Sequence, residues 1–480
     1  MAGIVCWCAY APNGLAETQR FSDREVALET LNYKLAIRID HKENKLRGRC
    51  WLTMLNSCKQ TVRHIPIILY PQLKVITVKT ADGTKLPFSQ EVLPFEDREK
   101  KKVNYIDVAA RNPIPAGEKS IVQIEYEGQL GGYVDAGYRY VQDHISEEFT
   151  IIRPECHAYP IIGYPSEKPL YKSIMKYFKK GFDYWVEVTV PKDFVVANGG
   201  KLVGKTNENG MVSYTYKNIK PAWRIDVCVA TYGILEDKES GLKVYYFIND
   251  ESAAKKVLDA MKRSHALFSK WFGELKNRGS LTVIELSNSY GSQVDVTCIL
   301  LEREAFGEKL YQVYHEVSHL WSPTSLDSLP SRFETEGLAN FLQFLVGEKL
   351  ENKEVLLEKG LEEKRRDFIK HCQWKPKLRD TPIADYGKQN LTDASYSKGM
   401  IAFYVLYRLV GEETFINIVR TFYQKHGESG ATLEDFINVV KQLSRTDLTK
   451  FFGEWIYGVE SSEYLLSSMS MEHIIAKYKT

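Results

Sequence analysis

Apolar and polar residues alternate with a period of two over most of the first 240 residues. Such alternation is typical of strands that bury one face. Asp82-Gly83 and Asn209-Gly210 supply the positive φ angles that tight hairpin turns require. The segments that carry the pattern predict a mostly antiparallel sheet: 33–39, 46–54, 73–78, 121–126, 184–190, 212–216, 225–232 and 242–248.

Near Asn249 the period changes from 2 to 3.6, and helices are expected almost to the end of the chain. A long helix ends at Trp271 and Phe272. Two short apolar runs follow it, and Thr432 with Asp435 resembles a helix cap. The two apolar runs are 281–285 and 296–301. The later helices are 396–410, 412–426 and 447–457, and the last of them ends at Gly458.

The change of period divides the chain into three parts. Residues 1–25 carry no clear pattern and are left unassigned, 26–245 form a β-rich domain, and 246–480 form a mainly helical domain. The predicted fold class is therefore α+β with more than one domain, which suits a chain of 480 residues.

Composition and charge exclude some classes of function. A net charge of +2 argues against a protein that binds nucleic acid or an anionic membrane. No stretch approaches 18 apolar residues, so no membrane span is expected. The eight cysteines form no CxxC pair, which favours reduced thiols and a cytoplasmic enzyme. A truncated export signal within residues 1–25 stays an alternative.

Candidate metal chemistry lies at His315-Glu316-x-x-His319. Residues four apart on a helix lie on the same face, so both imidazoles can reach one metal ion. Tyr314 and Val317 fall on the opposite side and predict a buried helix with one polar face turned to a cleft.

A tetrahedral zinc bound by two histidines needs a third protein ligand, with the fourth position kept for water. No histidine stands six residues after His319, because that position is Ser325. The remaining option is a carboxylate on a following helix, either Glu334 or Glu336. The buried apolar stripe of this helix begins at Leu338. The position of Glu336 relative to that stripe, in the first turn, favours it as the third ligand, and Glu334 is expected in solvent or supporting a ligand.

These residues resemble a known family. His315-Glu316-x-x-His319-x-Trp321 followed by Glu336-Gly337-Leu338-Ala339 is similar to the zinc aminopeptidase family of gluzincins, which includes aminopeptidase N and the leukotriene hydrolases. Tyr396-Ser397-Lys398-Gly399 resembles the YxKG motif of that family, and the likeness extends from about residue 30 to Gly458. It implies an N-terminal antiparallel β saddle domain followed by a thermolysin-like, mainly α catalytic domain.

The resemblance also implies a role for each site residue. One Zn²⁺ per chain would be held by His315, His319 and Glu336, Glu316 would act as the general base, and Tyr396 would stabilise the oxyanion. The expected function is a zinc metallopeptidase that releases N-terminal residues from a peptide substrate. The alternatives are a zinc endopeptidase or other amide hydrolase, and a non-catalytic peptide-binding scaffold.

Three departures from the family remain. The spacer between the histidines and Glu336 is two residues shorter than usual. The loop beginning at Gly291 lacks the glutamate that grips the substrate amine, although Gly291 can still align a peptide as an added strand. Glu155 is the expected substitute, with Asp295 and Glu302 as weaker candidates.

The third departure is that only 22 residues follow Gly458, which leaves no room for the usual C-terminal helical domain. The expectation is an open cleft, or one covered by the partner subunit of a homo-oligomer.

Overall fold

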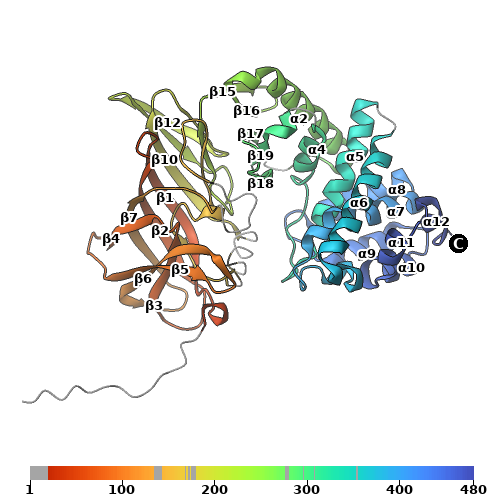
Figure 1. Cartoon of the computed structure of the whole chain (residues 1–480), viewed down its shortest axis with the longest axis horizontal. Coiled ribbons are helices and arrows are strands. Elements are labelled where there is room, and N and C mark those ends of the chain that lie inside the picture. Colours follow the sequence, from red (N-terminus) through yellow and green to blue (C-terminus); the bar gives the residue numbers. More distant parts are fainter. Residues whose placement is uncertain are drawn as a thin grey trace, which may run out of the picture.

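The computed structural model describes residues 20–479 except 134–142, 168, 171–172, 174–179, 276–280, 296, 307–308 and 353–354. Most of the unassigned segment 1–25, with Cys6 and Cys8, thus lies outside the described residues. Figure 1 shows two bodies, a β-rich one in red to yellow and a mainly helical one in green to blue.

The β-rich domain is built from three sheets. The largest has seven strands in the order β12-β13-β10-β1-β2-β7-β4, all antiparallel except the parallel pair β1 and β10. Its strands are β1 Leu28–Asp40, β2 Lys45–Asn56, β4 Leu73–Thr80, β7 Lys119–Gly128, β10 Asp183–Pro191, β12 Lys201–Glu208 and β13 Met211–Lys217. Alternate residues of β1, such as Leu35, Ile37 and Ile39, are buried, as the period of two predicts.

A four-stranded sheet packs its apolar residues into the same core, and a three-stranded sheet adjoins it. Ile67 of β3 and Ile106 of β6 are fully buried in this core. The strands are β3 Val62–Leu69, β5 Phe88–Phe95, β6 Arg98–Ile114 and β9 Ile161–Ile162, then β8 Thr150–Ile152, β11 Val195–Ala197 and β14 Val227–Ala230. The predicted mostly antiparallel domain is confirmed.

The second domain begins with a five-stranded sheet in the order β15-β16-β17-β19-β18. The strands are β15 Tyr232–Asp237, β16 Leu242–Phe247, β17 Leu281–Leu286, β18 Gln293–Asp295 and β19 Cys298–Glu302. Leu242 and Val244 of β16 share a core with Val257 and Phe268 of α2, Glu251–Phe272. Sheet membership thus places β15 and β16 with the helical domain, whereas the sequence boundary near 245 assigns β15 and most of β16 to the β-rich one.

Helices form the rest of the chain and pack around the core of α5 and α7. Their bounds are α3 Arg303–Phe306, α4 Tyr311–Ser318, α5 Leu338–Glu351, α6 Leu356–Trp374, α7 Lys398–Val410, α8 Glu412–His426, α9 Leu433–Leu443, α10 Thr449–Phe452, α11 Glu460–Leu466 and α12 Met471–Ala476. Short turns of 3-10 and π helix connect them, among them η5 Phe333–Gly337, η7 Ile383–Asp385, η8 Thr392–Tyr396 and η9 Gly453–Tyr457.

Two local predictions can be compared directly with these helices. Thr432 caps α9, because its hydroxyl accepts from the Asp435 amide at 3.2 Å and the Asp435 carboxylate accepts from the Thr432 amide at 2.9 Å. The helix expected at 447–457 is instead α10 continued by the π turn η9, and the prediction that it is the last helix was wrong. After Gly458 the chain still forms α11 and α12, which pack on the same core through Leu465 and Ile474.

The remaining global predictions concern the membrane and the cysteines. Within the described part of the chain, no helix combines the length and the apolar character that crossing a membrane requires. The six described cysteines are all free thiols, five of them buried, as the absence of a CxxC pair predicts.

Candidate active site

Helix α4 places the first two candidate ligands. Val317 and Tyr314 are buried in the core, and on the other side of the helix His315 and Glu316 are 8% and 7% exposed. The helix is shorter than the motif, because His319 stands at its C-cap. Beyond it, the Trp321 indole donates a hydrogen bond to the Gly273 carbonyl at 2.8 Å, which ties the end of the motif to the end of α2.

The three predicted metal ligands converge. Glu336 Oε2 lies 3.3 Å from His315 Nε2 and 3.4 Å from His319 Nε2, and the two histidine nitrogens are 3.1 Å apart. No other cluster of three such ligands occurs among the residues that the structure describes. Glu336 Oε2 is buried and accepts no hydrogen bond of good geometry. Three electron-rich atoms that face one point fit a tetrahedral zinc with one open position.

The ionised form of Glu336 is favoured, and that is the form in which a carboxylate binds a metal. Burial alone would raise the pKa of its carboxyl group, but Arg332 and the two histidines hold that pKa well below its usual range. The sequence predicts this carboxylate in the first turn of an α-helix. It lies instead in the π turn η5, which precedes α5. π turns inside helices frequently occur at functional sites.

Glu334 does not reach the ligand cluster. It is 2% exposed, which rules out the first of its two predicted places, solvent, and its Oε1 is 3.4 Å from the Ser325 hydroxyl. Burial raises the pKa of this carboxyl to about 7. Glu334 and Glu336 are two residues apart in a helical turn, so their side chains leave the turn in different directions.

Close packing of two glycines brings Tyr396 to the metal ligands. A Cβ on Gly337 would lie 3.2 Å from backbone atoms of Gly399, a closer contact than most Cβ atoms make, so a larger residue would push the two backbones apart. The turn with Glu336 therefore lies directly against the start of α7. The Tyr396 ring is consequently nearly parallel to the His315 ring, with centroids 6.2 Å apart. Burial and the Glu336 charge raise the pKa of the Tyr396 hydroxyl well above its usual value, so it stays a proton donor.

Glu316 lies beside the ligands on α4. Burial raises the pKa of its carboxyl group, although the neighbouring His315 and His319 oppose the shift. A carboxyl group with a raised pKa can accept a proton and pass it on. The structure thus places the predicted ligands, base and oxyanion donor in one region of the helical domain.

Gly291 lies before the edge strand of the five-stranded sheet. Among the strands that the structure describes, β18 pairs only with β19, so its other edge has no partner strand there. Gly291 has a φ of 75°, and its amide donates to Glu302 Oε1 at 2.7 Å. The Glu302 carboxylate is therefore already bound by the backbone of the loop. This makes Glu302 a still weaker candidate for binding the substrate amine.

Glu155 belongs to a buried network of charges in the β-rich domain. Arg224 donates to both of its carboxylate oxygens, at 2.8 and 3.0 Å, and to both oxygens of Asp226, at 2.6 and 2.7 Å. Arg153 pairs with Asp143 at 2.8 Å. The network holds two cations and three carboxylates, so it keeps one negative charge when all are ionised.

That excess charge is best placed at Glu155. Its side chain is 19% exposed, whereas the other four charged side chains are 0–5% exposed. The arginines Arg224 and Arg153 hold the pKa of Glu155 below its usual value despite burial. Arg224 also hydrogen-bonds Gln293 of β18, so this network connects Glu155 to the edge strand.

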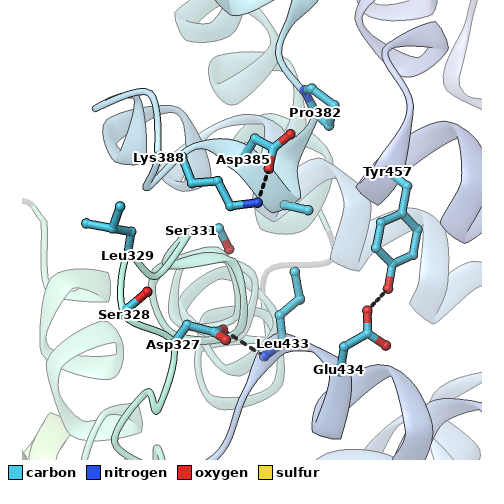
Figure 2. Close-up of a pocket in the computed structure, with 11 residues that line it drawn as sticks. Asp327, Ser328, Leu329, Ser331, Pro382, Asp385, Lys388, Leu433, Glu434 and Tyr457 are labelled. Carbon is cyan, nitrogen blue, oxygen red and sulfur yellow. Dashed lines mark hydrogen bonds and ion pairs between the residues drawn. The ribbon is translucent and has the colours of Figure 1, made fainter.

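A pocket of about 330 Å³ lies elsewhere in the helical domain, as Figure 2 shows. Its polar lining is already paired: Asp327 accepts from the Leu433 amide at 3.0 Å, and Lys388 donates to Asp385 at 2.6 Å. None of the predicted site residues lines this pocket. It is therefore not the candidate active site.

Two arginines of the site were not predicted from the sequence. The Arg332–Glu336 pair has i, i+4 spacing, a signal that could have been found. Arg224 contacts Glu155 across 69 positions of sequence, and no local pattern indicates this.

Comparison with known proteins supports the fold. Residues 297–455 match the model of the peptidase family M1 domain. An M1 zinc metallopeptidase from Deinococcus radiodurans aligns over 93% of this chain and 94% of its own, with a TM-score of 0.60 and 16% identity. A mutant described as a two domain M1 zinc metallopeptidase bound to L-arginine aligns at 16% identity over 93% and 95%, with a TM-score of 0.59.

A further solved structure is a mutant M1 zinc metallopeptidase from Deinococcus radiodurans bound to a Tyr-Ser-Ala substrate, with 15% identity, a TM-score of 0.59 and coverage of 93% and 95%. A search of curated proteins found no match. The solved structures confirm the predicted fold class, a β-rich domain followed by a mainly helical domain.

Proposed function

Since residues 297–455 match the peptidase family M1 domain, we propose that this chain is a zinc-dependent aminopeptidase that releases residues from the N-termini of peptides. The match agrees with the family resemblance of the sequence and confirms the prediction of a zinc metallopeptidase with one catalytic zinc. The observation that carries the proposal is the convergence of two histidines with the buried Glu336 Oε2.

Each residue of the site has one role in the proposed hydrolysis. His315, His319 and Glu336 hold the metal, which when bound polarises a water and lowers the pKa of that water toward neutrality. Glu316 takes the proton from the water and hands it to the leaving amine. The Tyr396 hydroxyl donates to the oxyanion that forms as the water attacks the peptide carbonyl.

The substrate backbone is proposed to lie along β18. An extended peptide can pair with a sheet edge through main-chain hydrogen bonds, and β18 is the edge next to Gly291. Glu155 is the proposed anchor for the α-amine, because its network has one excess negative charge and Arg224 connects it to β18. This geometry favours exopeptidase over endopeptidase activity.

Free and blocked substrates separate the candidate functions. The zinc-loaded protein is expected to cleave an aminoacyl amide with a free α-amine and to leave its N-acetylated form intact, which rates for both measured side by side will check. Equal cleavage of the two would support an endopeptidase or another amide hydrolase. No cleavage of either, with no zinc found by metal analysis, would indicate a peptide-binding scaffold.

Replacing Glu155 by Gln is expected to reduce kcat/KM for free-amine substrates about 10- to 100-fold, mainly through KM, because a charge-assisted hydrogen bond is worth about 1.5–3 kcal/mol. Steady-state kinetics on a short series of aminoacyl amides measures the loss. Glu302→Gln is the control, since that carboxylate binds the Gly291 amide. An unchanged KM in Glu155→Gln, with an unchanged unfolding temperature, would assign the amine to another residue.

We further propose that the protein works in a reducing compartment, the cytoplasm. The six free thiols support this, because an oxidising compartment favours paired cysteines. The homo-oligomer that would cover the cleft stays a prediction.

A further inference from the structure

We propose that Arg332 is a positioning residue for the metal centre, which holds Glu336 so that one carboxylate oxygen alone faces the two histidines. The inference rests on the proposed zinc site and adds to it a residue outside the ligand and base motifs. Both the backbone and the side chain of Arg332 contact Glu336.

The backbone of Arg332 shapes the turn in which Glu336 lies. Arg332 has a φ of 63°, in the left-handed region that residues other than glycine rarely adopt. Its carbonyl accepts from the Glu336 amide at 2.9 Å and from the Gly337 amide at 3.3 Å. The second of these bonds closes a turn one residue wider than that of an α-helix. Arg332 is thus the residue at which the π turn begins.

The side chain of Arg332 separates the two oxygens of the Glu336 carboxylate. Its Nη2 donates to Glu336 Oε1, while Oε2 lies 3.3 and 3.4 Å from the histidine nitrogens. The guanidinium also lies over the Tyr396 ring, 5.5 Å from its centroid. One oxygen is therefore engaged by a cation, and the other is left for the metal.

This arrangement has a consequence for metal binding. A carboxylate can bind a cation through one oxygen or through both. With Oε1 held by Arg332, Glu336 has one oxygen to offer, which keeps a coordination position for water. Residues that orient metal ligands in this way typically contribute 10- to 100-fold to metal affinity.

The charge of Arg332 acts in the opposite direction, because a guanidinium near the site repels a divalent cation. That repulsion is weakened by solvent, since the Arg332 side chain is 41% exposed. We therefore expect the orienting effect to be the larger one, so that zinc binds more tightly with Arg332 than without it. The sign of the change in affinity decides between the two effects.

The test compares zinc binding by the full chain and its variants. Arg332→Met is expected to raise the zinc Kd about 10- to 100-fold, measured by competition with a chelator. X-ray absorption of the zinc-loaded variant is expected to show an additional oxygen ligand. Arg332→Lys, which keeps a cationic donor, is expected to restore part of the affinity. Arg263→Met is the matched control, because Arg263 pairs with Asp259 four residues away and is 40% exposed.

Each other outcome has a defined meaning. A Kd for Arg332→Met within twofold of the wild type, a tighter Kd, or an unchanged absorption spectrum would overturn the inference. Unfolding of the metal-free proteins is measured in parallel, and Arg332→Gln repeats the comparison if the Met variant unfolds at a lower temperature. Failure of the wild type itself to bind zinc would overturn the proposed function, which keeps the two failures distinct.

Discussion

Replacing Glu316 by Gln is expected to lower kcat about 10²- to 10⁴-fold and to leave zinc bound, because general base catalysis contributes about that much. Gln has the size of Glu but cannot accept the proton of the attacking water. Glu316 is 7% exposed and is not one of the three converging ligands, so its replacement leaves the metal site intact. Steady-state kinetics and metal analysis of the same preparation measure both parts.

Glu334→Gln is the matched control for that experiment. Glu334 is also a buried glutamate near the site, but it is not among the converging ligands and contacts Ser325 instead. Burial raises its pKa to about 7, so an amide resembles its protonated form, and kcat is expected to stay within a few-fold of the wild type. Wild-type activity in Glu316→Gln would show that another group takes the proton.

Glycine packing explains why two segments far apart in sequence form one site. Gly337 directly follows the predicted ligand Glu336, and Gly399 lies three residues after Tyr396. The two glycine backbones meet at a distance that is tight for a Cβ. Beside them, the rings of Phe333 and Phe403 stack with centroids 4.4 Å apart. The hydrophobic core thus positions the turn that carries Glu336 against the start of α7, and this packing determines where the polar side chains lie.

The sequence predicted most where chemistry depends on local spacing. Two histidines four residues apart, and a glutamate just before a buried apolar stripe, could be recognised as candidate ligands from their spacing alone. The structure brings these residues, His315, His319 and Glu336, together. The π turn could not be predicted from the sequence. A period of 3.6 residues describes the α-helix alone, and the positive φ of Arg332 does not alter that period.

Long-range partners account for the other differences. β15 and β16 show the same alternation as the strands before them. Only the pairing of β16 with β17, and of β15 with β16, assigns them to the helical domain. Likewise Glu155 could be found as a candidate, but not its ion pair with Arg224. Local patterns specify which face of an element is buried, and leave open against which other element it packs.

Tyr396→Phe is expected to lower kcat about 10²- to 10³-fold and to change KM little, because the hydroxyl acts on charge that develops only in the transition state. The change removes one oxygen and keeps the ring that lies parallel to His315. Steady-state kinetics on a free-amine aminoacyl amide gives kcat and KM separately, and metal analysis checks that zinc is retained.

Tyr386→Phe is the control for the loss of a buried tyrosine hydroxyl. Tyr386 is fully buried and its hydroxyl has no hydrogen-bond partner in the described structure, so kcat is expected to stay at the wild-type value. A reduction in Tyr396→Phe that appears only in KM would place the hydroxyl on the bound substrate instead of the oxyanion. An unchanged kcat would remove Tyr396 from the reaction.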